Sequence, residues 1–540
     1  MGVSGFLDMR IFGFAFSVFA TVLSAFLLVL SYPPYEFNWL AWVALVPLLL
    51  AISARGLTAS FFLSFLWGII FLGEYFSFNL ATGEYKYLHH VMLGFCYPPL
   101  FGLFGLGFSL IARRLGLTTG LFLAPFLWAS LEYARANLFF LAMPMGLLAH
   151  SQYTAPFVVQ IASVAGSYGI SFLILLVNSA VAALVLFLAK SVRSSPSALL
   201  SLSRRGVVAL VISAALLSAL TLAYGWMAVS QPIAGREIKI SILQGNIDQN
   251  KKWNPKYAES IMQTYADLSS DASKAGPDLI VWPEAATPGL ILKRLNLLTQ
   301  MQSLIREIQT HFLVGSSEYP KFAEGPVKEP KSGNTALFFS PEGKVLGQYL
   351  KINLIPFAEY VPFEGVVPWP EFIVPEKKSS HIAGDEITLF ELDGAKFGVL
   401  ICWEAVYPEL VRRFVKEGAE FVVNLTNEAW FGTSPAARHS MTSVVLRAVE
   451  NRVFVVRCAN TGVSCFVDPY GRIVDRVKDS TGNDLFVRGI LTGTVIPMEA
   501  KTSYTRYGDW LVWVSMGCSV AFLIAALLRR KPDRGRRARM

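Results

Sequence analysis

The stretch KFGVLICWEAVYPEL, residues 396–410, contains an apolar run from Phe397 to Ile401 that predicts a buried strand. Cys402 follows at once, and a helix is expected to begin near Pro408, because proline suits the first helical turn. A cysteine on a strand-to-helix turn is exposed, and the amide dipoles of the helix favour its thiolate. This arrangement suits a nucleophile, although a free cysteine is commonly just a small buried hydrophobe.

The composition predicts a membrane protein that carries one soluble domain. Of 540 residues, 54% are hydrophobic and 16% are charged, against about 25% charged in soluble domains. Mean hydropathy is +0.47. Apolar residues dominate 10–230 and return at 510–528. We therefore expect a membrane domain over 1–230, a soluble domain over 236–500, and a last span with a basic tail over 508–540.

The net charge of +9 does not indicate a nucleic-acid partner, because seven of the basic residues lie in the last twelve positions. Such a cluster after an apolar span is an orientation signal or a contact for anionic lipids. The five cysteines have neither a disulfide framework nor metal-ligand spacing, so no metal and no cofactor are expected. The first apolar run has no clear cleavage site and is predicted to remain as a helix.

Apolar segments of spanning length occur on both sides of the soluble stretch. A bilayer core of roughly 30 Å needs about 20 apolar residues in a helix. The candidate spans are 11–32, 38–54, 58–79, 90–112, 117–133, 162–189, 207–229 and 510–528. Seven spans before the soluble domain place it across the membrane from the N-terminus. Arg10, Arg55, Arg113 and Lys190 then fall in loops on the N-terminal side, so the positive-inside rule predicts cytoplasmic termini and an extracytoplasmic soluble domain.

The soluble domain alternates strands with helices, which predicts an α/β sandwich. The predicted strands lie at 237–246, 278–285, 311–319, 334–340, 344–351, 397–401, 421–427 and 453–460, with a final pair around the turn at 468–471. The predicted helices lie at 257–272, 297–309 and 439–452.

Three reactive side chains follow predicted strands: Glu284, Lys351 and Cys402. Residues at the carboxyl ends of strands in an open α/β sheet face a common crevice, so we expect the three to meet. The carboxylate can take the thiol proton as general base, and the lysine can lower the thiol pKa and hold an oxyanion. Taken alone, Glu284 could cap a helix and Lys351 could be a surface lysine. No histidine is placed to replace Glu284, and His439 is predicted to be a helix cap or a surface group.

The order Glu…Lys…Cys resembles the nitrilase (carbon–nitrogen hydrolase) superfamily, whose fold is an α-β-β-α sandwich. The three motifs are WPEAATP (282–288), YLKINLIPFAEYVPF (349–363) and GVLICWEAVYPEL (398–410). A closer resemblance, covering essentially the whole chain, is to the apolipoprotein N-acyltransferase family. It rests on LQGNIDQNKKW (243–253), LIPFAEYVPF (354–363), NEAWFG (427–432) and RCANTGVS (457–464), and on the order of seven spans, one domain and one last span.

The resemblance implies a role for each matching position. Glu284 would be the general base, Lys351 the oxyanion and electrostatic partner, and Cys402 the nucleophile. Glu359 and Glu404 match two supporting acidic positions, which are more safely regarded as structural than as chemical.

Further matching positions are aromatic, and some depart from the family pattern. Trp253 matches a tryptophan at the mouth of the site. Trp403 stands where tyrosine is usual, so no role of a tyrosine hydroxyl can be carried over there. Ala358 and Glu428 replace glycine and aspartate, which are conservative changes.

The activity that the resemblance implies is a two-step acyl transfer. A phospholipid, commonly phosphatidylethanolamine, would give an acyl chain to Cys402 as a thioester. The α-amino group of the S-diacylglyceryl cysteine of an apolipoprotein would then take it, at the periplasmic side of a bacterial inner membrane. Two alternatives remain: a membrane-tethered nitrilase or amidase that hydrolyses a soluble C–N bond, and a non-catalytic membrane module.

Two segments suggest how a lipid would reach the site. The apolar, proline-rich loop at 366–378 lies between Lys351 and Cys402 and is predicted to be a lid that dips into the interface, or else a buried loop. Residues 137–153 are broken by Pro144 and Gly146, and could form a ledge under the catalytic domain or a re-entrant connector.

Overall fold

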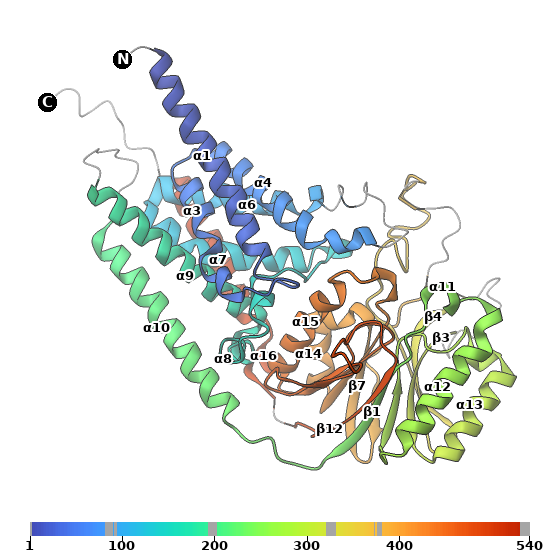
Figure 1. Ribbon diagram of the computed structural model, residues 1–540. Helices are drawn as coiled ribbons and strands as arrows, with labels where there is room; N and C mark the ends of the chain where they lie inside the picture. Colours follow the sequence, from blue (N-terminus) through green and yellow to red (C-terminus); the bar gives the residue numbers. More distant parts are fainter. Residues whose placement is uncertain are drawn as a thin grey trace.

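The computed structural model describes residues 3–81, 90, 94–192, 202–319, 331–371, 373–374, 381–499 and 501–529. A bundle of apolar helices stands against an α/β unit that contains two six-stranded sheets (Figure 1). The bundle comes from both ends of the chain, and the sheets come from the stretch between them. The predicted fold class, a polytopic helical part joined to an α/β sandwich, is confirmed.

Helices occupy each of the apolar spans predicted from the sequence. They are α1 (Val3–Val29), α2 (Ala41–Ala44), α3 (Val46–Ser53), α4 (Leu57–Tyr75), α6 (Pro98–Leu115), α7 (Leu117–Ala136), α9 (Ala162–Val192), α10 (Arg204–Val229) and α17 (Trp510–Leu528). In the described ranges, 5 helices are long and apolar enough to cross a membrane: α4, α6, α9, α10 and α17. Residues 91–93 of one predicted span, and 530–540 of the predicted tail, lie outside the described residues.

The second predicted span is interrupted, and a polar side chain from another helix completes it. At Leu45, between α2 and α3, the backbone N–H donates to Oδ1 of Asn178 on α9 (2.8 Å). The Asn178 amide donates in turn to the carbonyl of Ala41 (2.9 Å). Backbone polar groups left unpaired in hydrocarbon cost several kcal/mol each, so Asn178 makes this break tolerable inside a membrane bundle.

Helix α10 runs along the outside of the bundle and leads directly to the first strand (Figure 1). Val208, Ile212, Leu216 and Leu220 recur every fourth residue on it, and each is about half exposed. An unbroken apolar stripe of this length is stable when lipid chains cover it.

The two sheets have related topologies. The first has the order β12-β1-β2-β3-β4-β5 and the second β11-β10-β9-β8-β7-β6. The strands are β1 (Ile238–Gln244), β2 (Leu279–Trp282), β3 (His311–Glu318), β4 (Gly333–Phe339), β5 (Val345–Leu350), β6 (Leu389–Leu392), β7 (Ala395–Ile401), β8 (Phe421–Thr426), β9 (Phe454–Ala459), β10 (Cys465–Val467), β11 (Ile473–Arg476) and β12 (Gly489–Val495). Strands β1, β2 and β3 run parallel, as do β7, β8 and β9. Their carboxyl ends therefore lie together, where a site is expected.

The sheets pack face to face, with helices on their outer sides. Ile240, Val281 and Val399 belong to the apolar core between the sheets. Helices α12 (Ala258–Ser273) and α13 (Leu295–Ile308) cover the first sheet, where Tyr265 stacks on Trp282 with ring centroids 4.8 Å apart. Helices α14 (Pro408–Lys416) and α15 (Ala436–Asn451) cover the second sheet.

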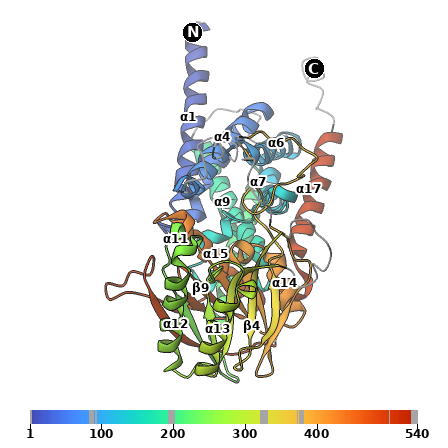
Figure 2. The ribbon, with the colours of Figure 1, turned by 90° about the vertical axis from the view of Figure 1, so that its right-hand side faces the viewer.

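Helix α15 is shared between the sandwich and the membrane bundle. Val444 and Val445 belong to the core of the sandwich. Leu446 and Val449, on its other side, belong to the core of the bundle. The described α/β unit is therefore not tethered loosely but packed against the helices, and α1 and α17 both point away from the sheets (Figure 2).

Candidate active site

Cys402 lies on a strained turn directly after β7. Its φ is 58°, in the left-handed region that side chains other than glycine seldom adopt. The turn continues as the short 3-10 helix η7 (Cys402–Val406) before α14 begins at Pro408, as predicted. Such strain persists only where the surroundings hold it, and it is common at functional sites.

Glu404 is the residue that holds this turn. It is fully buried and accepts hydrogen bonds from the backbone N–H groups of Ile401 (2.7 Å), Ile352 (2.7 Å) and Asn353 (3.0 Å), and from the hydroxyl of Tyr349 (2.9 Å). Burial raises the pKa of Glu404 to about 7, against the lowering effect of Lys351 and of these hydrogen bonds. Glu404 thereby joins the end of β7 to the loop after β5.

Glu284 is placed by a tight turn after β2. Ala285 has a φ of 45°, and the Ala286 N–H donates to the carbonyl of Gly315 on β3 (2.8 Å). A Cβ at Gly315 would lie 2.1 Å from the carbonyl oxygen of Pro283, so only glycine permits this approach. The buried Glu284 carboxylate lies next to the Cys402 thiol, on the first sheet's side of the site.

Lys351 lies just after β5, and its charge acts on the Cys402 thiol. It is fully buried, and its Nζ lies 2.8 Å from Oε1 of Glu359. Burial lowers the pKa of Lys351. The nearby groups of Glu359, and then of Cys402 and Glu284, raise it by more than burial lowers it, so the pKa lies above its ordinary value. The other oxygen of Glu359 accepts from the N–H of Ile355 (2.8 Å), which fixes this carboxylate against the lysine.

The electrostatics of the thiol differ from the expectation. Burial, and then the Glu284 carboxylate, raise the pKa of Cys402 well above its ordinary value, while Lys351 lowers it. The net direction is upward, opposite to the thiolate that a strand-to-helix turn alone favours, and Lys351 acts in the direction expected of a neighbouring positive charge. A protonated thiol beside a carboxylate can give up its proton at the moment of attack.

Two polar residues at the site were missed by the sequence reasoning. Lys252 ends the short helix α11 (Gln249–Lys252), is buried, and donates from Nζ to the backbone carbonyl of Glu284 (2.8 Å). Burial lowers the pKa of Lys252 to about 8, although Glu284 and Cys402 raise it. Asn334 donates from its amide to Oε1 of Glu284 (2.6 Å). Between them they fix both the backbone and the carboxylate of Glu284.

Comparisons with known proteins agree with this architecture. The carbon-nitrogen hydrolase family model matches residues 239–497, and the model described as apolipoprotein N-acyltransferase N-terminal domain matches residues 24–180. The apolipoprotein N-acyltransferase of Geobacter metallireducens is 35% identical, over 94% of this chain and 95% of its own. The chain belongs to the apolipoprotein N-acyltransferase family. It is a multi-pass membrane protein.

Two more distant similarities were also found. The apolipoprotein N-acyltransferase of Azotobacter vinelandii is 31% identical, over 76% of this chain and 73% of its own. A crystal structure of an amidase from Nesterenkonia sp. is 18% identical, with a TM-score of 0.38, over 53% of this chain and 98% of its own.

The two tryptophans singled out in this N-acyltransferase-family chain have different surroundings. Trp253 directly follows Lys252, and its side chain is 49% exposed. Trp403, which replaces the usual tyrosine, stacks on Phe431 with ring centroids 6.3 Å apart. The rings of Trp403 and Phe431, with Glu428, line a cavity of about 10 Å³. This cavity has room for one water and not for an acyl chain.

His439 contradicts its prediction. It lies inside α15, is 3% exposed, and packs against the rings of Tyr75 (centroids 4.4 Å apart) and Phe78 (5.4 Å) from the bundle. Burial lowers its pKa to about 3, so the imidazole is neutral. His439 is neither a cap nor a surface group, because the membrane helices cover the face of α15 that a soluble domain would expose.

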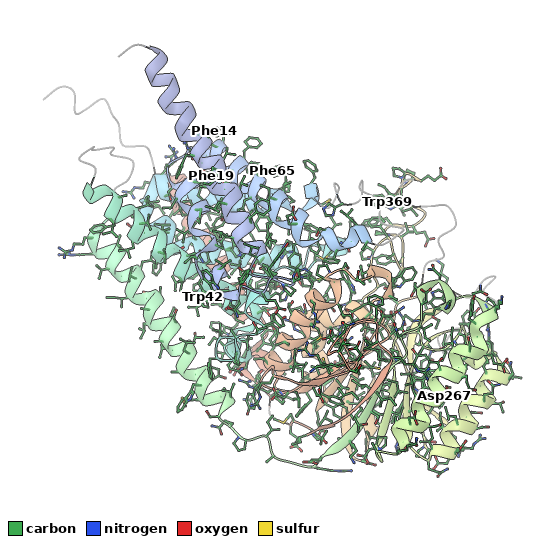
Figure 3. All side chains as sticks on the ribbon, viewed as in Figure 1. Phe14, Phe19, Trp42, Phe65, Asp267 and Trp369 are labelled. Carbon is green, nitrogen blue, oxygen red and sulfur yellow. The ribbon has the colours of Figure 1, made fainter. Side chains whose placement is uncertain are left out.

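The predicted ledge and the predicted lid both pack against the loop that carries Glu359. Phe140 on the 137–153 segment packs against Phe363 (centroids 5.5 Å) and Phe357 (6.3 Å) of the Glu359 loop. Trp369 packs on Phe357 (5.0 Å) and lies level with the bundle helices, far from Asp267 on α12 (Figure 3). Residues 372 and 375–378 of the predicted lid lie outside the described residues. The lid's motion stays a prediction.

The side chains at the site carry the groups that acyl transfer needs. In the part of the chain that the structure describes, no three His, Cys, Asp or Glu side chains form a group that could hold a metal ion. A thiol, a carboxylate and an ammonium group are chemically able to act as a nucleophile, a proton acceptor and an oxyanion partner.

Proposed function

We propose that this protein transfers an acyl chain from a phospholipid to the α-amino group of the S-diacylglyceryl cysteine of an apolipoprotein, with Cys402 as nucleophile. The observation that carries the proposal is the Cys402 thiol beside the Glu284 carboxylate and close enough to the Lys351 ammonium to feel its charge, in a unit packed against a membrane bundle. Similarity to named N-acyltransferases over nearly the whole chain supports the same substrates.

In the first step, Glu284 takes the thiol proton and the Cys402 sulfur attacks the ester carbonyl of the phospholipid, phosphatidylethanolamine in our proposal. The Lys351 ammonium stabilises the oxyanion of the tetrahedral intermediate. The ester C–O bond breaks, and protonated Glu284 returns the proton to the leaving alkoxide, which departs as lysophospholipid. Cys402 then carries the acyl chain as a thioester.

In the second step, the uncharged α-amino group of the apolipoprotein attacks the thioester carbonyl. Glu284 takes a proton from the nitrogen, Lys351 again stabilises the oxyanion, and the C–S bond breaks. The proton passes from Glu284 to the leaving sulfur, which restores the Cys402 thiol. The product is an amide, so the apolipoprotein gains a third acyl chain.

The proposed domain order gives both substrates access to the site. Residues 1–230 form the membrane domain, 236–500 the catalytic domain, and 508–540 the last span and tail. We place the catalytic domain on the periplasmic side of the bacterial inner membrane, with both termini in the cytoplasm. Both acyl donor and acceptor are lipids of the bilayer, which explains why the catalytic unit packs against helices.

The test is mass analysis of the full-length protein after incubation in vesicles of phosphatidylethanolamine. The unchanged chain should gain one fatty acyl group on the peptide that contains Cys402, and Cys402→Ala should gain none. When a diacylated lipopeptide is added, the acyl group should leave Cys402, and a triacylated lipopeptide should appear. If Cys402 stays free while a soluble amide is hydrolysed, the membrane-tethered amidase is correct and this proposal is wrong.

A further inference from the structure

A buried ionic cluster joins the membrane bundle to the turn that carries Cys402. Its members are Ser167 on α9 and the pair Arg447 and Glu450 on α15. All three are at most 1% exposed. Buried ion pairs contribute little net stability because of their desolvation cost, so this cluster calls for another explanation.

The bundle side of the cluster is a break in a membrane helix. Gly166 interrupts α9 with a φ of 66°, which leaves the N–H of Ser167 at the start of the helix that continues to Val192. Oε1 of Glu450 accepts from that N–H (3.0 Å) and from the Ser167 hydroxyl (2.5 Å). The α/β unit thus supplies the N-terminal cap of a membrane helix, where a negative charge also complements the helix dipole.

The other side of the cluster reaches the catalytic turn. Arg447 pairs with Glu450 (Nε to Oε2, 2.7 Å) and donates from Nη2 to the Ser167 hydroxyl (2.9 Å). Its remaining arm, Nη1, donates to the carbonyl of Val406 (3.1 Å). Val406 is the last residue of η7, the helix that starts at Cys402. One planar guanidinium therefore holds the membrane helix and the nucleophile turn together.

The turn that starts at Cys402 has two separate attachments with different consequences. Its beginning is held to the sheets by Glu404, which sets the position of Cys402 relative to Glu284 and Lys351. Its end is held to α9 by Arg447. The first attachment determines the local chemistry, and the second determines where the thiol lies relative to the bilayer.

We infer that Ser167, Glu450 and Arg447 form a positioning relay that holds Cys402 at the height at which it meets the ester carbonyl of a bilayer phospholipid. The inference rests on the proposed function, because it takes Cys402 as the nucleophile and a membrane lipid as donor. Misplacing reacting groups by about 1 Å can cost roughly a hundredfold in rate. A soluble reagent that approaches from water has no such height requirement.

The test uses Arg447→Lys in the full-length protein. A single ammonium can keep the charge of the pair but cannot reach both Glu450 and Val406, so we expect thioester formation from vesicle phospholipid to fall roughly tenfold or more. Alkylation of Cys402 by iodoacetamide, a small soluble reagent, should stay within about twofold of the unchanged protein. The double variant Arg447→Met/Glu450→Gln leaves no buried unpaired charge. It should likewise lose thioester formation while keeping the rate of Cys402 alkylation.

The matched control is Arg452→Met, which lies one turn further along the same interface. Arg452 contacts Gln160, the carbonyl of Pro469 (3.0 Å) and Ser163 (3.4 Å), but none of its recorded partners belongs to η7. In Arg452→Met, the rate of thioester formation should therefore not fall relative to the rate of Cys402 alkylation.

Two outcomes would overturn the relay. The first is an unchanged rate of thioester formation in both Arg447 variants, and the second is an equal fall in thioester formation and alkylation. A failure of the unchanged protein to form any thioester would instead refute the proposed function, and the two failures are therefore distinguishable.

Discussion

At the scale of single residues, the surroundings of the Cys402 thiol favour its protonated form. The raised pKa of the Cys402 thiol, caused by burial and by Glu284, protects it from reactions that need a standing thiolate. Lys351 counteracts this only in part, because burial and the carboxylates of Glu284 and Glu359 raise the same pKa. In the proposed reaction, we expect the thiol to lose its proton to Glu284 when a substrate arrives.

The two charged neighbours of the thiol predict opposite effects on its titration. Glu284→Gln removes a negative charge that raises the pKa of Cys402, so alkylation by iodoacetamide should begin at lower pH than in the unchanged protein. Lys351→Met removes a positive charge that lowers this pKa, so alkylation should begin at higher pH. Both variants should lose acyl transfer. The measurement is the rate of Cys402 alkylation between pH 7 and about 10, and a shift of both variants in one direction would contradict the described charge arrangement.

Lys252 predicts a pH dependence of stability. Its pKa is lowered from 10.5 to about 8 by burial, so between these values the unfolded chain binds more protons than the folded chain. The free energy of unfolding should therefore rise with pH across that window, by roughly 3 kcal/mol, and the gain should be absent below pH 8. Lys252→Met should abolish this rise.

The measurement is thermal unfolding in detergent at several pH values, compared between the two proteins. The exposed Lys274→Met is the control and should retain the rise. A parallel pH dependence in Lys252→Met and the unchanged protein would contradict the assignment.

At the scale of elements, the proposed catalytic residues that could be predicted from the sequence are those that follow a strand. Glu284, Lys351 and Cys402 follow β2, β5 and β7, whose apolar runs are evident in the sequence. Lys252 was missed because a lysine in the polar run QNKK is indistinguishable from a surface lysine until the chain folds over it. The strands β6 and β12 were also missed, since β6 is only 4 residues long and β12 is a half-exposed edge strand rich in glycine and threonine.

The break in α9 shows a second limit. Hydropathy is uniform across Gly166, so the sequence predicted one continuous span, whereas the cap for the broken helix comes from Glu450, far along the chain. Long-range partners of this kind are a tertiary property. The burial of His439 against Tyr75 and Phe78 of the bundle could not be predicted for the same reason.

The Glu404 carboxylate, which accepts the hydrogen bonds around η7, should contribute measurably to the free energy of unfolding. Glu404→Ala leaves the N–H groups of Ile352, Asn353 and Ile401 buried without an acceptor, so the free energy of unfolding should fall by roughly 3 kcal/mol or more. Glu409→Ala, which removes a half-exposed surface partner of Arg412, should change it by less than about 1 kcal/mol. Thermal unfolding in detergent measures both, and equal effects would show that Glu404 does not hold the turn.

At the scale of the whole molecule, the bundle and the sandwich share an interface and not merely a linker. The chain passes from α10 into β1, and it returns from β12 through α16 (Ser503–Tyr507) to α17. The outer ends of α1 and α17 both lie at the end of the bundle away from the sheets (Figure 2). This arrangement supports the proposal that both termini are on one side of the membrane and the sheets on the other.

The proposed orientation predicts which positions an impermeant reagent can reach. In a chain with Cys96→Ser, a cysteine introduced for exposed Asp271 on α12 should react with a membrane-impermeant maleimide added to the periplasmic side. A cysteine introduced for exposed Ser203, before α10, should react only after the inner membrane is broken. The readout is mass of the labelled protein, and the reverse pattern would invert the topology.

The pairing of β1 with β12 has a consequence for synthesis on the ribosome. These neighbours in the first sheet are antiparallel from Ile238 opposite Val495 to Gln244 opposite Gly489, yet roughly 250 residues separate them along the chain. At about 5–20 residues per second, β1 is made roughly 12–50 s before its edge partner. During that interval α10 already anchors β1 beside the lipid, and its free edge is open to wrong partners. We therefore expect the nascent protein to need protection on the far side of the membrane until its last span is made.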